Sequence, residues 1–393
     1  MQLSISKEEI KERQRRFAEK LAEKQIDAAI LFGGAEIFYL TGFNFFPTER
    51  PIVFLMDTKQ QSHLFLPEME KDHAENFAYV DHVRDYYEYP SISHPMEHFR
   101  QLLLELGLTY KVIGMDAPGY SSTMGYRGPK IDEVFNQASY VSIKSLVETM
   151  RMIKSSTEIE LIRESCRWAN LAHQYLQKYT KEGLREIEIS SRATFDATLA
   201  MSKTLGSRYT PHGNPAHAFY RGQIGEDSAL PHSVTSNAVI KRGDVLISQA
   251  SADVWGYKSE LERTMFMTEV NDKQEEYFSL MKGAQEVAFQ VMKPGLSCSE
   301  VERAVQRYYQ DNGIEHLTLC HVGHSIGILG HEAPFLDMGD STIMQSGMVF
   351  TVEPGIYVKG LGGFRHSDTV LVTDDGIEIL TYYPRNLESL ICK

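Results

Sequence analysis

Residues 228–267 read SALPHSVTSNAVIKRGDVLISQASADVWGYKSELERTMFM, a stretch that combines a histidine, two strand-like runs and several carboxylates. The apolar run at 245–248 and the run at 256–266 predict two strands joined by a turn. Because residues i and i+2 of a strand project from the same face, we expect Glu260 and Glu262 to point into one space. The alternative is an amphipathic hairpin whose glutamates face water, and the rest of the chain must decide between the two.

Length and composition favour a two-domain enzyme. The chain has 393 residues, of which 42% are hydrophobic, enough for two separate cores. A net charge of -13 argues against nucleic acid as a partner, because phosphate binding requires clustered lysine and arginine. The N-terminus lacks an apolar signal region and no apolar run reaches about eighteen residues, so we expect a cytoplasmic protein without membrane insertion. The scattered cysteines indicate free thiols.

The pattern of elements changes near residue 150. Before it, apolar strand-like runs alternate with helical segments, which predicts a compact α/β domain over residues 1–150. After it, long helical patterns alternate with strand pairs, which predicts an α+β domain over residues 151–393. The helices of this second domain are expected near residues 157–178, 184–203, 273–291 and 298–312.

Six motifs follow one another in the second domain. They are PHS at His232, GYKSELERT, KPGLSCSEVE, GHSIGILGHEAP, GMVFTVEPGIY and GGFRHSDTVLVT. In this order they resemble the pita-bread superfamily of methionine aminopeptidases, prolidases, aminopeptidase P and creatinase. The first 150 residues, with FYLTGF and ERPIVFL, resemble the smaller domain that prolidases, aminopeptidase P and creatinase place before the catalytic one. The resemblance implies an α+β fold, with a C-terminal pita-bread domain after a smaller α/β creatinase-type domain.

The metal-ligand positions implied by the resemblance are degenerate in this chain. The family's metallopeptidases hold two divalent ions with two aspartates, a histidine and two glutamates. The corresponding positions here are Gln249, Glu260, His324, Glu353 and Ser367. A neutral amide and a hydroxyl replace two carboxylates, so the set loses two negative charges and no longer suits a dinuclear site. We therefore expect no metal cofactor, with a single weakly held divalent ion as the alternative.

Creatinase is the branch of the family that works without metal, and the chain resembles it at LERT and GHS. The resemblance implies that His232 is the general acid/base and that Glu262 and Glu353 hold a cationic group of the substrate. It also implies that Arg50 holds the substrate carboxylate. The chemistry is reasonable, because an imidazole with a pKa of about 6.5 can accept a proton from water and return it to a leaving nitrogen.

The predicted pocket also departs from creatinase. Glu260 is an additional acid, and His331 in GHEAP follows the peptidase pattern, in which that histidine contacts the substrate. We count Glu260, His324, His331 and Arg50 as substrate-binding residues. An acidic pocket opposite an arginine predicts a small zwitterionic substrate, because each charge needs an opposite partner once water is removed. Amino-acid derivatives, guanidino acids and short peptides would all fit.

The prediction from sequence is thus a metal-independent, creatinase-like hydrolase of a C–N bond in a small zwitterion. The first alternative is an Xaa-Pro dipeptidase or aminopeptidase with an unusual metal site. The second is a catalytically silent homologue that binds a small molecule. The family's two-domain members commonly dimerise, which implies a homodimer in which Arg50 serves either its own pocket or that of a partner subunit.

Overall fold

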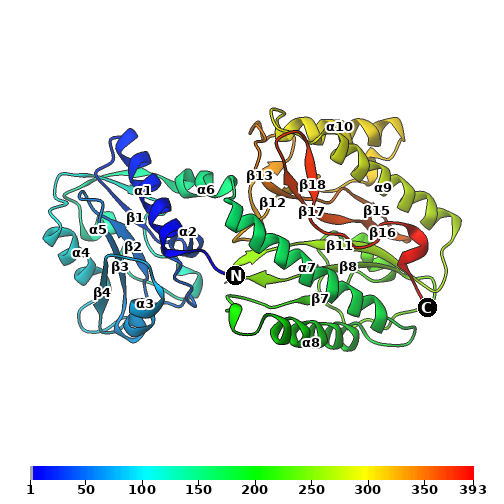
Figure 1. Ribbon diagram of the computed structural model, residues 1–393, viewed down its shortest axis with the longest axis horizontal. Coiled ribbons are helices and arrows are strands. Elements are labelled where there is room, and N and C mark those ends of the chain that lie inside the picture. The colour runs from blue at the N-terminus through cyan, green and yellow to red at the C-terminus, as the bar shows by residue number, and fades with distance from the viewer. Residues whose placement is uncertain (1–2) are drawn as a thin grey trace. The chain divides into compact units, whose positions relative to one another are not determined.

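The computed structural model (Figure 1) describes residues 3–393. The chain divides into two compact units, a smaller one of Ile5–Arg151 and a larger one of Met152–Lys393 together with the start of the described chain. Each unit mixes helices with sheets. Among the described residues, no helix is both long enough and apolar enough to cross a lipid bilayer.

The smaller unit is built on a six-stranded sheet with strand order β4-β3-β2-β1-β5-β6. Its strands are β1 (Ala28–Leu31), β2 (Val53–Met56), β3 (Ser62–Pro67), β4 (His82–Tyr86), β5 (Val112–Met115) and β6 (Ser139–Ser142). Its helices are α1 (Lys7–Glu23), α2 (Gly34–Thr41), α3 (Lys71–Phe77), α4 (Pro95–Glu105), α5 (Ile131–Val134) and α6 (Lys144–Met152). Helix α1 begins after Ser6, whose hydroxyl caps it by accepting a hydrogen bond from the Glu9 amide.

The larger unit is built on a nine-stranded sheet whose main path is β13-β12-β14-β17-β11-β8-β7. These strands are β7 (His217–Phe219), β8 (Val245–Ser251), β11 (Leu261–Met267), β12 (Gly323–Ser325), β13 (Glu332–Leu336), β14 (Val349–Val352) and β17 (Ser367–Val372). Two further strands, β18 (Ile377–Ile379) and β19 (Ile391–Cys392), pair with β17 and β11. Separate two-stranded ribbons join β9 (Asp253–Val254) to β10 (Tyr257–Lys258) and β15 (Gly355–Val358) to β16 (Gly362–Arg365).

Two pairs of helices accompany this sheet (Figure 1). Helix α7 (Ser156–Tyr179) packs on α8 (Glu186–Leu205), and α9 (Asp272–Val291) packs on α10 (Cys298–Asp311). The Ser155–Glu158 capping box fixes the start of α7, and that of α9 is fixed in the same way. Short 3-10 turns occur at Glu68–Glu70, Ser122–Met124, Gly206–Arg208, Gly225–Ala229, Glu315–Leu317 and Leu387–Leu390.

Strand register gives the large sheet two different polar faces. Glu262 of β11 lies opposite Gln249 of β8 and Ser367 of β17, so these three side chains share one face, the site face. The next residues along the strands, among them Ser248 and Asp368, point to the other face, the helix face. Helices cover that face, because His173 of α7 bonds to Ser248 and Gln285 of α9 bonds to Asp368. The pleat thus separates a helix-covered face from the face that carries the predicted site.

Candidate active site and metal centre

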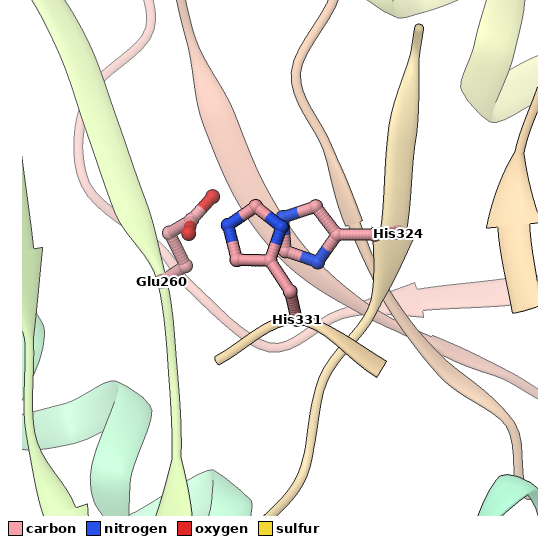
Figure 2. Close-up of side chains that lie close together, drawn as sticks. All are labelled: Glu260, His324 and His331. Atoms are coloured by element: carbon pink, nitrogen blue, oxygen red, sulfur yellow. The ribbon is translucent and has the colours of Figure 1, made fainter. Parts of the chain in front are cut away.

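Three of the predicted site residues form a compact cluster on the site face. Glu260 directly precedes β11, His324 lies in β12, and His331 lies in the loop before β13. One ligand atom from each lies within 4.8 Å of the other two, and Figure 2 shows the Glu260 carboxylate beside the two imidazole rings. The rings of His324 and His331 stack with their centroids 3.7 Å apart. The structure thus brings these three predicted site residues together, while their roles stay predictions.

His324 is the most constrained member of this cluster. Its side chain is fully buried, and Nδ1 donates a hydrogen bond to the backbone oxygen of Ser325 at 3.0 Å. Its buried Nε2 lies 3.0 Å from Oε1 of Glu353, with which the protonated ring forms an ion pair, and has no other partner among the described residues. Burial disfavours the imidazolium, yet the carboxylates of Glu353 and Glu260 outweigh burial and raise the pKa of His324 to about 9.

Glu260 is buried among groups of its own charge. Burial is the largest cause that raises its pKa to about 8, and the neighbouring carboxylates of Glu353 and Glu262 add to the effect. The Ser367 hydroxyl donates a hydrogen bond to Oε1 of Glu260 at 2.8 Å. For Glu353, burial opposes ionisation, but His324 and a nearby arginine outweigh it and lower the pKa to about 2. The opposite shifts at Glu260 and Glu353 follow from carboxylates that repel one another beside the imidazole of His324.

Arg365 is a site residue that the sequence interpretation missed. Its guanidinium grips both carboxylate oxygens of Glu262, with Nη2 2.8 Å from Oε1 and Nε bonded to Oε2, and both side chains are buried. Nε also lies 3.7 Å from Oε2 of Glu353, and Nη1 donates to the Tyr357 hydroxyl at 3.0 Å. The sequence carried no signal for this pairing, because Arg365 ends β16 in a separate ribbon, whereas Glu262 lies in β11 of the large sheet.

The two degenerate positions also lie on the site face. Ser367 hydrogen-bonds to Glu260, and Gln249 faces Glu262 across the strand pair. All five positions implied by the family resemblance therefore come together, although two of them carry neutral side chains. His366, between Arg365 and Ser367, points away from the site and packs edge-on against Phe278 of α9.

His232 lies on an exposed loop before β8. Burial is the main cause that lowers the pKa values of His321 and His331, and the charge of His232 contributes to both. The acid/base role of His232 stays a prediction. His321 was missed in the sequence, and its ring centroid lies 6.4 Å from that of His324.

Arg50 belongs to the smaller unit, and its guanidinium is already engaged there. Nε and Nη2 bind the two carboxylate oxygens of Glu88 at 2.6 Å and 3.2 Å, and Glu49 forms a second ion pair. The hydrogen bond that Arg50 donates to Glu88 is the largest cause that raises the pKa of Arg50. Its predicted role in holding a substrate carboxylate stays a prediction.

A cavity of about 240 Å³ opens beside the cluster. Glu260, His331 and Gln249 contribute polar atoms to its wall, while Phe219 and Ile326 contribute apolar surface. A larger hollow of about 390 Å³ next to α7 is lined mainly by aromatic and aliphatic side chains and contains none of the predicted site residues. Chemistry and cavity therefore coincide only at the smaller hollow.

The cluster fits a divalent metal ion. A neutral His324 that donates from Nδ1 presents a lone pair at Nε2, and such a fixed tautomer is typical of metal-binding histidines. This nitrogen is buried without a hydrogen bond, and the carboxylate of Glu260 and a nitrogen of His331 lie within 4.8 Å. A second set of ligand atoms, from Glu260, Glu262 and Glu353, is equally compact.

Comparison with known proteins agrees with this geometry. Residues 160–374, more than half of the chain, match the model of metallopeptidase family M24, and residues 13–153 match the creatinase/prolidase N-terminal domain. An Xaa-Pro dipeptidase of Pyrococcus horikoshii is 27% identical over 382 residues, which cover 96% of this chain and 98% of that protein. The putative dipeptidase YkvY of Bacillus subtilis is 27% identical over 93% of this chain and 96% of its own length.

Solved structures give the same result. The prolidase from Pyrococcus horikoshii superposes with a TM-score of 0.80 at 25% identity, covering 96% of this chain and 99% of that one. The Xaa-Pro dipeptidase from Bacillus anthracis superposes with a TM-score of 0.80 at 27% identity, covering 97% and 99%. These matches confirm the predicted pita-bread superfamily and α+β fold class, and they confirm that the chain is a peptidase-like enzyme.

Two predictions are wrong. The metal-independent, creatinase-like function is contradicted by the relatives, which are Xaa-Pro dipeptidases and prolidases, and by the metallopeptidase model that the chain matches. The structure gives the physical reason. Arg365 is already hydrogen-bonded to the Glu262 carboxylate that was expected to hold a substrate cation.

The prediction of no cofactor is contradicted by the match to a metallopeptidase family. It is also opposed by the cluster of Glu260, His324 and His331, whose ligand atoms could hold a metal ion. The neutral residues Gln249 and Ser367 misled the sequence interpretation, since it counted His331 as a substrate contact and not as a possible metal ligand. The chain belongs to metallopeptidase family M24, as a two-domain, prolidase-like member.

Proposed function

We propose that this protein is a metal-dependent dipeptidase that hydrolyses Xaa-Pro dipeptides at the cluster of Glu260, His324 and His331. The observation that carries the proposal is the buried, unbonded Nε2 of His324, which faces two carboxylates in a chain of the M24 family. The names of the dipeptidase relatives support the choice of substrate.

Bound at this cluster, a divalent ion would supply a water of lowered pKa and a Lewis acid for the peptide carbonyl. The chain's own residues provide the rest. Glu260, His324 and His331 hold the ion, while His232, on its exposed loop, protonates the leaving proline nitrogen. Arg365 fixes Glu262 and the nearby Glu353, so the carboxylates keep their positions as substrate enters.

The cavity supports a small substrate. Its volume of about 240 Å³ lies below the roughly 300–1,000 Å³ of drug-sized ligand sites, which favours a dipeptide over a longer chain. Phe219 and Ile326 offer apolar contact to a proline ring or to a side chain next to it. Arg50 as a partner of the substrate carboxylate, a homodimeric assembly and a cytoplasmic location belong to this proposal as well.

The experiment is release of proline from Xaa-Pro dipeptides by protein dialysed against chelator and then supplied with zinc, cobalt or manganese. We expect hydrolysis that returns with metal, that is faster for Xaa-Pro than for Xaa-Ala, and that is slow for tripeptides. His324→Ala should abolish it, while His366→Leu, on the helix face, serves as a matched control for the loss of a buried histidine. Equal hydrolysis in chelated and metal-loaded protein would contradict the proposal.

His232 gives a second test of the same function. His232→Asn keeps polarity but removes proton transfer near neutral pH, so kcat should fall by about 10²–10⁴ with little change in metal content. A variant with near-normal kcat would remove His232 from the role given to it here.

A further inference from the structure

The site face carries more carboxylates than its internal cations balance. Glu260, Glu262 and Glu353 converge within 4.8 Å of one another, and Arg365 is the guanidinium in contact with two of them. In a buried site such an excess is neutralised by protons or by a further cation, because an unbalanced buried charge is costly. The question is how many cations the site accepts and where.

The set of three carboxylates already has a cation beside it, the guanidinium of Arg365. Arg365 binds both oxygens of Glu262 and lies 3.7 Å from Glu353, while Tyr357 and the backbone oxygen of Pro231 fix its Nη1. Its side chain is only 4% exposed. An arginine held on so many sides cannot make way for a metal ion without leaving its own charge buried and unpaired.

The other set is open to a cation. Nε2 of His324 is buried and makes no hydrogen bond, and ligand atoms of Glu260 and His331 lie within 4.8 Å. Within the described residues, this set and the carboxylate set are the two places where such ligand atoms converge. One of the two sets thus already holds a guanidinium, whereas the other holds a histidine nitrogen that faces carboxylates.

We propose that this protein binds a single divalent ion, at Glu260, His324 and His331, and that the guanidinium of Arg365 stands in place of a second ion. The inference rests on the proposed function only in taking the enzyme to require metal. One divalent ion and one guanidinium together balance the three carboxylates. Gln249 and Ser367 then need no charge, since the ion they would help to bind is absent.

The ligand chemistry also selects the metal. Two imidazoles and one carboxylate suit zinc or cobalt, whereas manganese and magnesium prefer sites made of oxygen ligands. We therefore expect this site to bind zinc and cobalt more tightly than manganese.

Metal stoichiometry is the first measurement. The full-length protein is stripped with chelator, reloaded with zinc or cobalt, dialysed and analysed by inductively coupled plasma mass spectrometry. We expect one ion per chain, and the cobalt form should show the visible absorption of nitrogen coordination. Two ions per chain, or none, would overturn the proposal.

His331 is the ligand that separates this site from the five positions implied by family resemblance. His331→Ala should weaken zinc binding by about 10–100-fold or more, the range already seen when only a supporting partner of a metal ligand is lost. His321→Ala is the matched control, because this neighbouring ring lies outside the cluster, and its zinc affinity should stay within about twofold of wild type. Equal affinity in all three proteins would exclude His331 as a ligand.

Arg365 provides the decisive variant. Arg365→Met removes the internal cation, so the three carboxylates should now accept a second ion, whereas Arg365→Lys keeps a cation and should keep one. If Arg365→Met does not fold, Glu262→Gln tests the same assignment. A glutamate that binds arginine and not the metal ion can be neutralised without loss of the single ion, so this variant should still bind one ion per chain. Loss of the ion in Glu262→Gln would overturn the assignment.

The outcomes distinguish this inference from the proposed function. One bound ion without cleavage of Xaa-Pro dipeptides would remove the function and leave the site as assigned. Metal-dependent cleavage with two ions per chain would keep the function and reject the assignment of Arg365.

Discussion

The two faces of the large sheet treat buried charge in opposite ways. On the helix face, Arg263 and Asp368 form a fully buried ion pair at 2.7 Å, and Asp368 also accepts hydrogen bonds from Thr381 and Gln285. The remaining donors of Arg263 reach backbone oxygens, among them that of Pro384 at 2.9 Å. On the site face, a few ångströms away through the same strands, a buried histidine nitrogen has no hydrogen bond and carboxylates crowd together.

This difference separates a structural network from a functional one. A satisfied network contributes to a unique packing, whereas an unsatisfied one lowers stability unless a ligand completes it. Arg263 and Glu262 are consecutive residues, so the pleat of one strand places the two networks back to back. Burial and charge alone would not have told them apart, since both faces are polar and buried.

The largest expected effect comes from breaking the helix-face network. Asp368→Asn would leave the cation of Arg263 buried without a charged partner, at a cost of about 3–5 kcal/mol in the free energy of unfolding. Both tryptophans, Trp168 and Trp255, lie in the larger unit, so their fluorescence during urea unfolding reports on that unit. Asp374→Asn, at an exposed carboxylate, is the control. A loss below about 1 kcal/mol would mean that the network is not the structural one.

Binding of zinc at the site face should have the next largest effect on the free energy of unfolding. At a zinc concentration of one hundred times Kd, binding to the folded state alone adds about 2.7 kcal/mol to stability, and chelator removes it. The measurement is the shift in Tm of wild type on adding zinc, with His324→Ala as the variant that should not respond. An unchanged Tm in wild type would show that nothing completes the site in this way.

Mild acid should lower the free energy of unfolding through a buried histidine on the helix face, His366. Burial is the largest cause that holds the pKa of His366 well below its usual range, so the folded state keeps this ring neutral while the unfolded state gains a proton. This contribution is fully present above about pH 6.5 and is lost as the pH falls below it, by roughly 1 kcal/mol at pH 5.5. His366→Leu should flatten the fall in stability over this range, and an equally steep curve would contradict the prediction.

The smallest effect is expected from a site-face residue in the metal-free protein. Glu260→Gln removes a like charge from beside Glu353 and Glu262, so chelated variant and chelated wild type should differ by less than about 1 kcal/mol in unfolding free energy. The same variant should lose most of its zinc affinity. A large destabilisation without metal would place Glu260 among the structural residues.

Local patterns in the sequence carried much of the fold. The helices α7 to α10 occupy the stretches predicted for them, because capping residues and apolar spacing mark their limits within the segment itself. In the segment KIDEVFNQA, residues 130–138, only Ile131–Val134 are helical. The chain turns there to bury Phe135 and then enters β6. Tertiary packing overrides helix propensity at that position.

The candidate site was predictable where chemistry follows position in a motif. Glu260, His324, His331 and Glu353 lie together as expected, but the partner of Glu262 was not foreseen. Arg365 reaches Glu262 from the end of another ribbon, a pairing that only three-dimensional register decides. Without it, the carboxylates looked ready for a cationic substrate, and the neutral Gln249 and Ser367 seemed to signal the loss of metal.

The ion pair between Arg365 and Glu262 affects how the protein would behave in a cell that is short of metal. This cation is part of the chain, so neither chelation nor competition from other proteins can remove it. When the exchangeable ion departs, Glu262 and Glu353 stay anchored, and the backbone oxygen of Ser325 still orients His324. The metal-free protein would therefore keep the geometry of its binding site. Its activity would rise and fall reversibly with the concentration of available metal.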